Sequence, residues 1–172
     1  IAPQLVGAAV LRLSAPAMRG DDIYWCEGRP AEQGRVALVR RTPDGETRDV
    51  IPAPFNVRTR VHEYGGVSYW VTEDALYFSN FADQRLYCLR PAAAPQPITP
   101  DAAFRYADCI PDARRGRLIA VREDHTRPGG GEPVNALVGL DLGGENAGQV
   151  LASGHDFYAS PRALIGTNKV EA

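Results

Sequence analysis

The sequence has few of the residues that build disulfide frameworks, metal sites or membrane spans. Its 172 residues include three cysteines, Cys26, Cys88 and Cys109, which lie far apart and in no C-x-x-C spacing. Such a sparse, odd set predicts free, buried thiols in a reducing compartment rather than a disulfide or zinc framework. No apolar run approaches the roughly 18 residues that a membrane-spanning helix needs, and residues 1–13 lack the basic start of a signal peptide. We therefore expect a cytoplasmic protein with no membrane partner.

The sequence also lacks a strong excess of charge of either sign. The net charge is −2, and charged residues make up 23% of the chain. Lysines and arginines are scattered, and the densest positions are the pairs Arg40–Arg41 and Arg114–Arg115. Binding to the phosphate backbone of a nucleic acid needs a basic patch, so the pattern predicts no nucleic-acid partner.

Motifs that would carry catalysis or bind a cofactor are missing. No serine lies in G-x-S-x-G, the turn that exposes a hydrolase nucleophile, and the glycine run of "RPGGGEP" lacks a P-loop lysine. The histidines His62, His125 and His155 are isolated from one another. His62 and Glu63 are neighbours, but on a strand neighbouring side chains point to opposite faces and rarely share an ion. The sequence predicts no catalytic residue, no metal site and no cofactor.

What the chain does contain is a succession of short strands. Its 17 glycines and 14 prolines are spread evenly, and between them lie runs rich in β-branched and aromatic residues. None of these runs keeps a helical period over three turns, and "PDAAFRYA" (100–107) is expected to form no more than a helical turn. The predicted class is all-β. The runs are "DIYWCEG", "RVALVRR", "RDVIPA", "VSYWVT", "ALYFSN", "QRLYCLR", "QPITP", "RLIAVRE", "NALVGLDL" and "GQVLASG".

The runs repeat in a fixed order. The apolar strands that begin at Ile23, Leu76 and Leu118 are separated by about 53 and then about 42 residues, which is the period of a four-stranded β-propeller blade. Each is followed by a mixed charged and apolar strand and then a short one. A single blade cannot bury both of its faces, and a closed ring needs about four blades or more. Three antiparallel blades therefore predict a partial propeller that belongs to a longer ring or assembles with another copy.

The stretch 58–87 gathers most of the polar residues that could belong to a site. The pair Gly65–Gly66 enters a strand and is expected to serve a close backbone approach or a positive φ. Asn80 and Asp83 lie between two apolar strands, where they are expected to bond the backbone of a hairpin turn. His62 and Glu63 fall just before the glycines, near the expected axis or the top face of the propeller, where they could line its channel.

Several long strings resemble one family. "DDIYWCEGRPAEQGRVALVRRTPDGETRDVIPAPFNVRTRVHEYGGVSYWV", "LYFSNFADQRLY", "VREDH" with "EPVNALV", and "GHDFYASPR" resemble the N-terminal β-propeller of bacterial prolyl oligopeptidase family serine peptidases of the acylaminoacyl-peptidase-like group. The resemblance runs from about residue 1 to residue 162. It implies a serine hydrolase active in proteolysis, whose propeller caps an α/β-hydrolase domain and admits peptides but not folded proteins. In some members, propeller carboxylates also bind the free N-terminus of the substrate.

The resemblance sets the expected domain organisation. Residues 1–162 are expected to form the partial propeller, with blades at 5–55, 58–101 and 104–154 followed by the start of a further strand. Residues 163–172, "ALIGTNKVEA", depart from the pattern of the family and are expected to form an atypical tail. The hydrolase domain is expected to be absent from this fragment, so no catalytic residue of the family is carried over.

Two functions follow from these expectations. In the first, the chain is a non-catalytic propeller fragment that gates and positions peptide substrates over a catalytic domain located elsewhere. His62, Glu63 and Glu123 are then the candidates for contact with the substrate. In the second, the chain is a stand-alone interaction module that self-associates through its open blade edges to complete a ring.

Overall fold

We describe the protein from a computed structural model, which covers residues 10–129, 131–163 and 170–171. The chain divides into two compact units, residues 1–57 and residues 58–172. Apart from one short 3₁₀ helix, the regular elements are β-strands. Within the described residues, no helix is long and apolar enough to cross a membrane.

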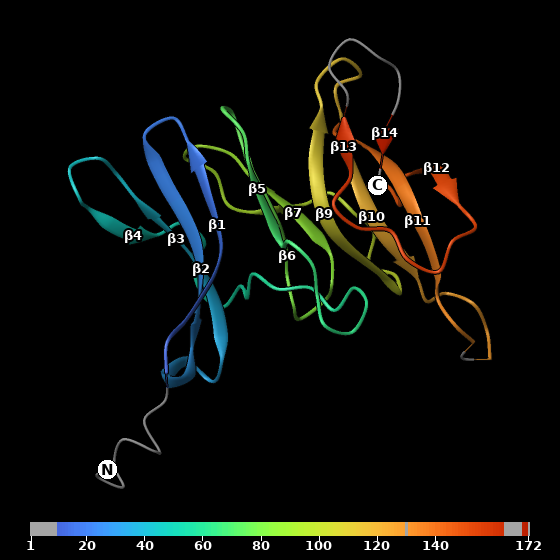
Figure 1. The fold of residues 1–172 in the computed structure, drawn as a ribbon, viewed down its shortest axis with the longest axis horizontal. Helices are drawn as coiled ribbons and strands as arrows, with labels where there is room; N and C mark the ends of the chain where they lie inside the picture. Colours follow the sequence, from blue (N-terminus) through green and yellow to red (C-terminus); the bar gives the residue numbers. More distant parts are fainter. Residues whose placement is uncertain (1–9, 130, 164–169, 172) are drawn as a thin grey trace, which may run out of the picture. The chain divides into compact units, whose positions relative to one another are not determined.

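The first unit is one antiparallel sheet of four strands in the order β1-β2-β3-β4. It is drawn in blue to cyan in Figure 1. A two-residue turn at Gly20 and Asp21 joins the first two strands, and Gly20 has the positive φ of 59° that such turns favour. The 3₁₀ helix η1 (Pro30–Glu32) leads into the third strand. The strands are β1 (Arg12–Arg19), β2 (Asp22–Arg29), β3 (Arg35–Arg41) and β4 (Thr47–Asp49).

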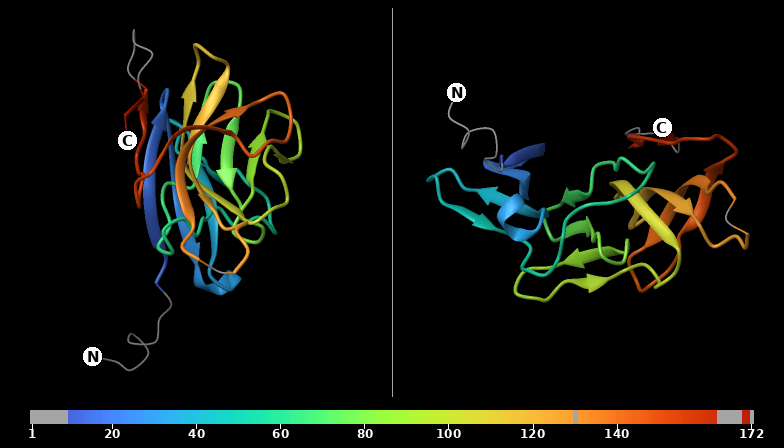
Figure 2. Two further views of the ribbon diagram at one scale, coloured as in Figure 1. Left: turned by 90° about the vertical axis from the view of Figure 1, so that its right-hand side faces the viewer. Right: turned by 90° about the horizontal axis from the view of Figure 1, so that it is seen from below.

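The second unit contains two four-stranded antiparallel sheets with the same sequential strand order. Figure 1 shows them in green and in yellow to orange, and Figure 2 gives two further views of the same meanders. The first sheet consists of β5 (Tyr69–Val71), β6 (Leu76–Ser79), β7 (Leu86–Leu89) and β8 (Gln96–Pro97). The second consists of β9 (Phe104–Asp112), β10 (Arg117–Asp124), β11 (Val134–Asp141) and β12 (Gln149–Ser153). The two-stranded ladder of β13 (Arg162–Ala163) with β14 (Val170–Glu171) follows them.

The core of the second unit is shared by its two large sheets. Alternate residues of the strands point into it, as the period-2 pattern of the sequence predicts. Tyr106 is fully buried there, and burying a large apolar side chain of this kind contributes about 1.5–3 kcal/mol. The buried side chains are Ala75, Tyr77, Leu86, Cys88, Ile98, Tyr106, Cys109, Leu118, Ala120, Ala136, Val138 and Leu140.

The structure confirms the predicted class, an all-β partial propeller built from three four-stranded antiparallel blades. The three sheets fall within the ranges 5–55, 58–101 and 104–154. Cys26, Cys88 and Cys109 are buried and carry thiols rather than disulfides, as predicted. Most of the tail at 163–172 lies outside the described residues.

Two local expectations were wrong. The segment 104–107 of "PDAAFRYA" is not a helical turn but the start of β9, because its backbone pairs with the far end of β10. A local helical preference of a few residues is too weak to compete with such a ladder. His62 and Glu63 do not lie on a strand. They occupy a turn, with positive φ values of 57° and 62°.

Candidate functional site

The turn at residues 61–64 sets His62 and Glu63 in opposite surroundings. The Glu63 N–H donates to the carbonyl of Arg60 at 2.8 Å, and the Gly65 N–H donates to the carbonyl of Val61 at 2.8 Å. The His62 side chain is 6% exposed, whereas the Glu63 side chain is 79% exposed. The turn therefore buries an imidazole and presents a carboxylate to solvent.

The two glycines that follow fix the course of the chain into β5. Gly65 has a φ of 88°, which only glycine adopts without strain. A Cβ on Gly66 would lie 2.9 Å from Asp108 Oδ1 and 3.0 Å from Ala107 Cβ, so a side chain there would force Asp108 and Ala107 to shift. These are the two causes that the sequence predicts for the pair, a positive φ and a close approach.

Glu123, on β10, binds the inner side of this turn. Its side chain is 3% exposed, and a buried carboxylate must find donors for its oxygens. Oε1 accepts a hydrogen bond from the His62 backbone N–H at 2.7 Å and lies 3.3 Å from His62 Nδ1. Oε2 lies 3.0 Å from His125 Nε2 and 3.6 Å from an Arg105 guanidinium nitrogen.

Arg105 connects the buried carboxylate to the exposed one. It lies on β9 directly opposite Glu123 in the ladder with β10. Its guanidinium donates to Glu63 Oε1 at 2.5 Å and to the carbonyl of Arg60 at 3.0 Å. The hydrogen bond from Arg105, together with the charge of Arg105, lowers the pKa of Glu63, which therefore stays ionised at neutral pH.

The structure thus brings together all three residues that the sequence singled out. His62 and Glu63 come from the turn before β5, and Glu123 comes from a strand about 60 residues later. Together with two further residues they form one group, which we name the Glu123 cluster: His62, Glu63, Arg105, Glu123 and His125.

Two exposed aromatic rings flank the cluster. The Phe157 ring meets the His62 ring edge-on, with centroids 5.0 Å apart, and the Tyr64 ring lies 5.8 Å from it. Tyr64 is 81% exposed and Phe157 is 65% exposed. An ionised carboxylate beside exposed aromatic rings can contact a ligand that combines a positive charge with an apolar group.

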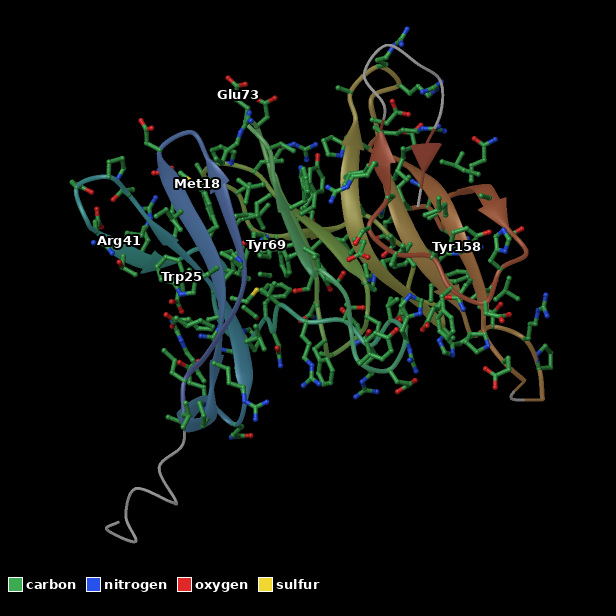
Figure 3. All side chains as sticks on the ribbon, in the orientation of Figure 1. Met18, Trp25, Arg41, Tyr69, Glu73 and Tyr158 are labelled. Atoms are coloured by element: carbon green, nitrogen blue, oxygen red, sulfur yellow. The ribbon has the colours of Figure 1, made fainter. Side chains whose placement is uncertain are left out.

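The segment that carries Phe157 is anchored to the rest of the unit. His62 Nε2 lies 3.0 Å from the carbonyl oxygen of Tyr158, and since a carbonyl only accepts, Nε2 carries the proton. Tyr158, labelled in Figure 3, packs against Val61, Ala107, Val121 and Leu137. These contacts hold the connection between β12 and β13 against the turn at 61–64.

A bulge in β9 provides a further anchor. Asp108 has a φ of 53°, and the ladder between β9 and β10 shifts register next to it. Asp108 Oδ1 accepts from the Val67 N–H at 2.7 Å, and Oδ2 accepts from the Ser160 N–H at 2.9 Å. One carboxylate therefore fixes both the entry to β5 and the segment after Tyr158, and β-bulges near functional sites often redirect side chains in this way.

The polar turn at 80–84 has a structural role, as the sequence predicts. Asp83 Oδ1 accepts from the Arg85 N–H at 3.1 Å and from Asn80 Nδ2 at 3.1 Å. Its other oxygen accepts the hydroxyl of Tyr87 at 2.6 Å. Ser79 donates its hydroxyl to the carbonyl of Tyr106 at 2.8 Å. The Asp83 bonds build the hairpin between β6 and β7, and the Ser79 bond connects β6 to β9.

Sequence reasoning missed Arg105, Tyr64 and Phe157. Arg105 was hidden because its segment has the composition of a helical turn, whereas its role depends on its place opposite Glu123. The aromatic residues carry no local signal of exposure. Over the ranges that the structure describes, no group of three or more His, Cys, Asp or Glu side chains is arranged to hold a metal ion.

The fold has close counterparts among solved structures. A puromycin-hydrolyzing peptidase of Mycobacterium tuberculosis superposes with a TM-score of 0.80 and 37% sequence identity over 88% of this chain and 26% of the peptidase chain. A puromycin hydrolase gives a TM-score of 0.72 at 36% identity over 80% of this chain and 23% of the hydrolase. A serine-to-alanine mutant of puromycin hydrolase complexed with PGG gives 0.69 at 36% identity, over 76% of this chain and 22% of the mutant chain.

The chain spans about a quarter of the length of these structures. No family model matches the sequence, and no curated protein matches it either.

Proposed function

Because this chain is a partial β-propeller that resembles about a quarter of a prolyl oligopeptidase family peptidase, we propose that it is a non-catalytic propeller segment that gates and positions peptide substrates. The bond chemistry takes place in a catalytic domain outside this chain. The three buried, reduced thiols favour a reducing, cytoplasmic location.

The observation that carries the proposal is the Glu123 cluster. Glu63 presents an ionised, 79% exposed carboxylate whose position Arg105 and the 61–64 turn fix from behind. A charge-assisted hydrogen bond from a protonated amine to a carboxylate gives both binding energy and direction. Glu63 binds the amino terminus of the peptide, and Tyr64 and Phe157 contact its first side chains. His62 and Glu123 hold the turn in place.

Two assays on the purified chain test the proposal that it has no catalytic activity of its own. The chain is expected to hydrolyse no aminoacyl or peptidyl chromogenic substrate and to stay unlabelled by a fluorophosphonate probe. Specific labelling of a serine, accompanied by turnover, would overturn this part of the proposal.

Calorimetry with two matched peptides tests the proposal that Glu63 binds the amino terminus of a peptide. A tripeptide with a free amino terminus is expected to bind about tenfold more tightly than its N-acetylated form, because acetylation removes the charge that Glu63 recognises. Glu63→Gln is expected to abolish this difference. Glu132→Gln, at an exposed position outside the cluster, serves as the control and should preserve it. Equal binding of both peptides to the unaltered chain would contradict the assignment of Glu63.

A second candidate function, self-association, rests on the first unit. Among the described residues β1 pairs with β2 alone, and Leu13, Met18 and Ile23 on these two strands are exposed. An open edge with apolar side chains favours the addition of another strand or sheet. Light scattering is expected to give twice the 18.6 kDa mass of one chain. A well-folded monomer at high concentration would rule out this second function.

A further inference from the structure

Beside the Glu123 cluster, two arginines share one aromatic ring. The guanidinium carbons of Arg58 and Arg60 lie 4.7 Å and 4.5 Å from the centroid of the Phe81 ring. Both arginines are exposed, and Thr59 between them is 2% exposed. This alternation places the two arginine side chains on the same side of the segment.

The segment with the arginines and the loop with the ring are fixed to each other. The Arg58 N–H donates to the carbonyl of Ser79 at 3.1 Å. The Arg60 N–H donates to Gln84 Oε1 at 2.8 Å, and Gln84 Nε2 donates in turn to the carbonyl of Phe81 at 2.8 Å. A single glutamine side chain therefore joins the two pieces, so the arrangement exists before any ligand arrives.

Ion pairing distinguishes Arg58 and Arg60 from other arginines of the chain. Among the residues that the structure describes, neither Arg58 nor Arg60 forms an ion pair with a carboxylate, whereas Arg29, Arg35 and Arg40 all do. Glu63 lies close enough for the charge of Arg60 to contribute to its lowered pKa, but its Oε1 atom is bonded to Arg105. Two guanidinium groups next to one ring repel each other, and an anion bound between them would offset this electrostatic repulsion.

A carboxylate is the anion that suits this arrangement. A guanidinium that stacks on a ring keeps its N–H groups free at the edge, in the fork geometry that matches the two oxygens of a carboxylate. Arg60 also joins the arginine pair to Glu63, because the Arg60 carbonyl accepts a hydrogen bond from the same Arg105 that binds Glu63. The negatively charged Glu63 and the positively charged arginine pair are therefore neighbours on the second unit. Together they complement the two charged ends of a short peptide.

We propose that Arg58 and Arg60, stacked on Phe81, bind a carboxylate of the peptide ligand. The proposal rests on the proposed function in one respect, that the ligand is a peptide. The carboxylate comes either from the C-terminus of a short peptide or from an aspartate or glutamate side chain, and the experiment separates these two sources.

The test measures the affinity of the full chain for three tripeptides by calorimetry. They are Ala-Gly-Gly as the free acid, Ala-Gly-Gly amide, and Ala-Asp-Gly amide. The free acid is expected to bind about fivefold or more tightly than its amide, with an advantage that decreases as salt is added. If Ala-Asp-Gly amide recovers the affinity, the site takes a side-chain carboxylate. If it does not, the site takes the C-terminus.

Variants assign the effect to these arginines. Arg58→Gln and Arg60→Gln are each expected to reduce the acid-over-amide preference, and the double variant to abolish it. Arg60→Lys keeps the positive charge but loses the paired N–H donors of the guanidinium. It is expected to keep only part of the preference for the acid over the amide. Arg90→Gln, at an exposed arginine just after β7, is the control that should leave it unchanged. All these positions are exposed, so the substitutions are expected to leave the fold intact. An unchanged melting temperature of each variant checks this.

The outcomes distinguish this inference from the proposed function. The carboxylate site is overturned if neither the Ala-Gly-Gly free acid nor Ala-Asp-Gly amide binds the unaltered chain more tightly than Ala-Gly-Gly amide, or if the double variant keeps the preference. The Glu63 assignment fails separately, if N-acetylation has no effect while the acid-over-amide preference remains.

Discussion

At the scale of single residues, Glu123 explains why the candidate site has one defined shape. Its buried carboxylate accepts the backbone N–H of His62 and lies beside the side chains of His125 and Arg105. Without the carboxylate, the His62 N–H and the His125 ring would lose this acceptor, whereas Arg105 would keep its bonds to Glu63 and to the Arg60 carbonyl. Glu123 therefore positions the turn that presents Glu63, and does not itself need to touch a ligand.

The first prediction concerns the stability that this carboxylate provides. Glu123→Ala is expected to lower the free energy of unfolding by about 2–4 kcal/mol, because it leaves the buried His62 N–H without an acceptor and removes the carboxylate beside His125 and Arg105. Glu123→Gln keeps one acceptor oxygen for His62 and should cost less, about 1–2 kcal/mol. Urea unfolding measures both. Glu132→Ala, at an exposed position, should change stability little, and an equally small effect of Glu123→Ala would refute the role of Glu123.

The second prediction concerns the pH dependence of Glu63. Arg105 lowers the pKa of Glu63 below its ordinary value of 4.5. The folded chain thus binds the proton more weakly than the unfolded chain, and the pair stabilises the fold at pH values above 4.5. This contribution is lost as the pH falls through the lowered pKa. Carbon-detected NMR of the Glu63 carboxyl should show a midpoint below 4.5 that returns toward 4.5 in Arg105→Gln. A midpoint at or above 4.5 in the unaltered chain would contradict the pairing.

At the scale of the elements, the site depends on the contact between the entry to β5 and the bulge of β9. Gly66 lies against Ala107 and Asp108, and the Asp108 carboxylate bonds the backbone of both Val67 and Ser160. The bulge therefore aligns three segments that are distant in sequence. A shift of any one of them would move the turn that holds Glu63.

Gly66→Ala tests this alignment. The added Cβ would lie 2.9 Å from Asp108 Oδ1, closer than Cβ atoms come to other heavy atoms in proteins, and 3.0 Å from Ala107 Cβ, which is tighter than most Cβ contacts. We expect a loss of about 1–3 kcal/mol in the free energy of unfolding, with NMR shifts in the segments around Val67 and Ser160. Gly131→Ala is the matched control, because its Cβ would meet nothing within 4 Å and Gly131 has no positive φ. Equal effects of the two substitutions would show that Gly66 is not a point of close approach.

The elements also show what the sequence can predict. The strands around Tyr24, Leu76 and Leu118 follow from a period-2 apolar pattern and from the glycines and prolines between them, because these signals are local. The bulge at Asp108 and the turn at His62 are not local. They depend on a carboxylate that bonds residues about 40 and 50 positions away, and on Glu123, about 60 positions from His62. The candidate residues could be named from the sequence, but Arg105, which joins them, could not.

At the scale of the whole molecule, each blade carries one buried thiol, in β2, β7 and β9. Burial raises the pKa of Cys109 to about 12 and also raises that of Cys88, so little thiolate exists near neutral pH. The three thiols therefore report on the folding of the three blades.

We expect Ellman's reagent to react slowly with the native chain at pH 7.5 and to release three equivalents after unfolding in guanidinium chloride. Mass spectrometry of partly labelled chains identifies which thiol reacts first as denaturant is added. Rapid labelling of Cys109 in the native chain would contradict its burial in the core of the second unit.

The central claim is that this propeller segment binds a peptide at the Glu123 cluster without cleaving it. The most direct test is a two-dimensional NMR titration of the ¹⁵N-labelled chain with a tripeptide that has a free amino terminus, followed over several hours. We expect saturable shifts in the amides of residues 60–66 and around residues 105, 123 and 157–158, while the signals of the peptide stay intact. Signals of cleaved peptide, or saturable shifts confined to other parts of the chain, would contradict it.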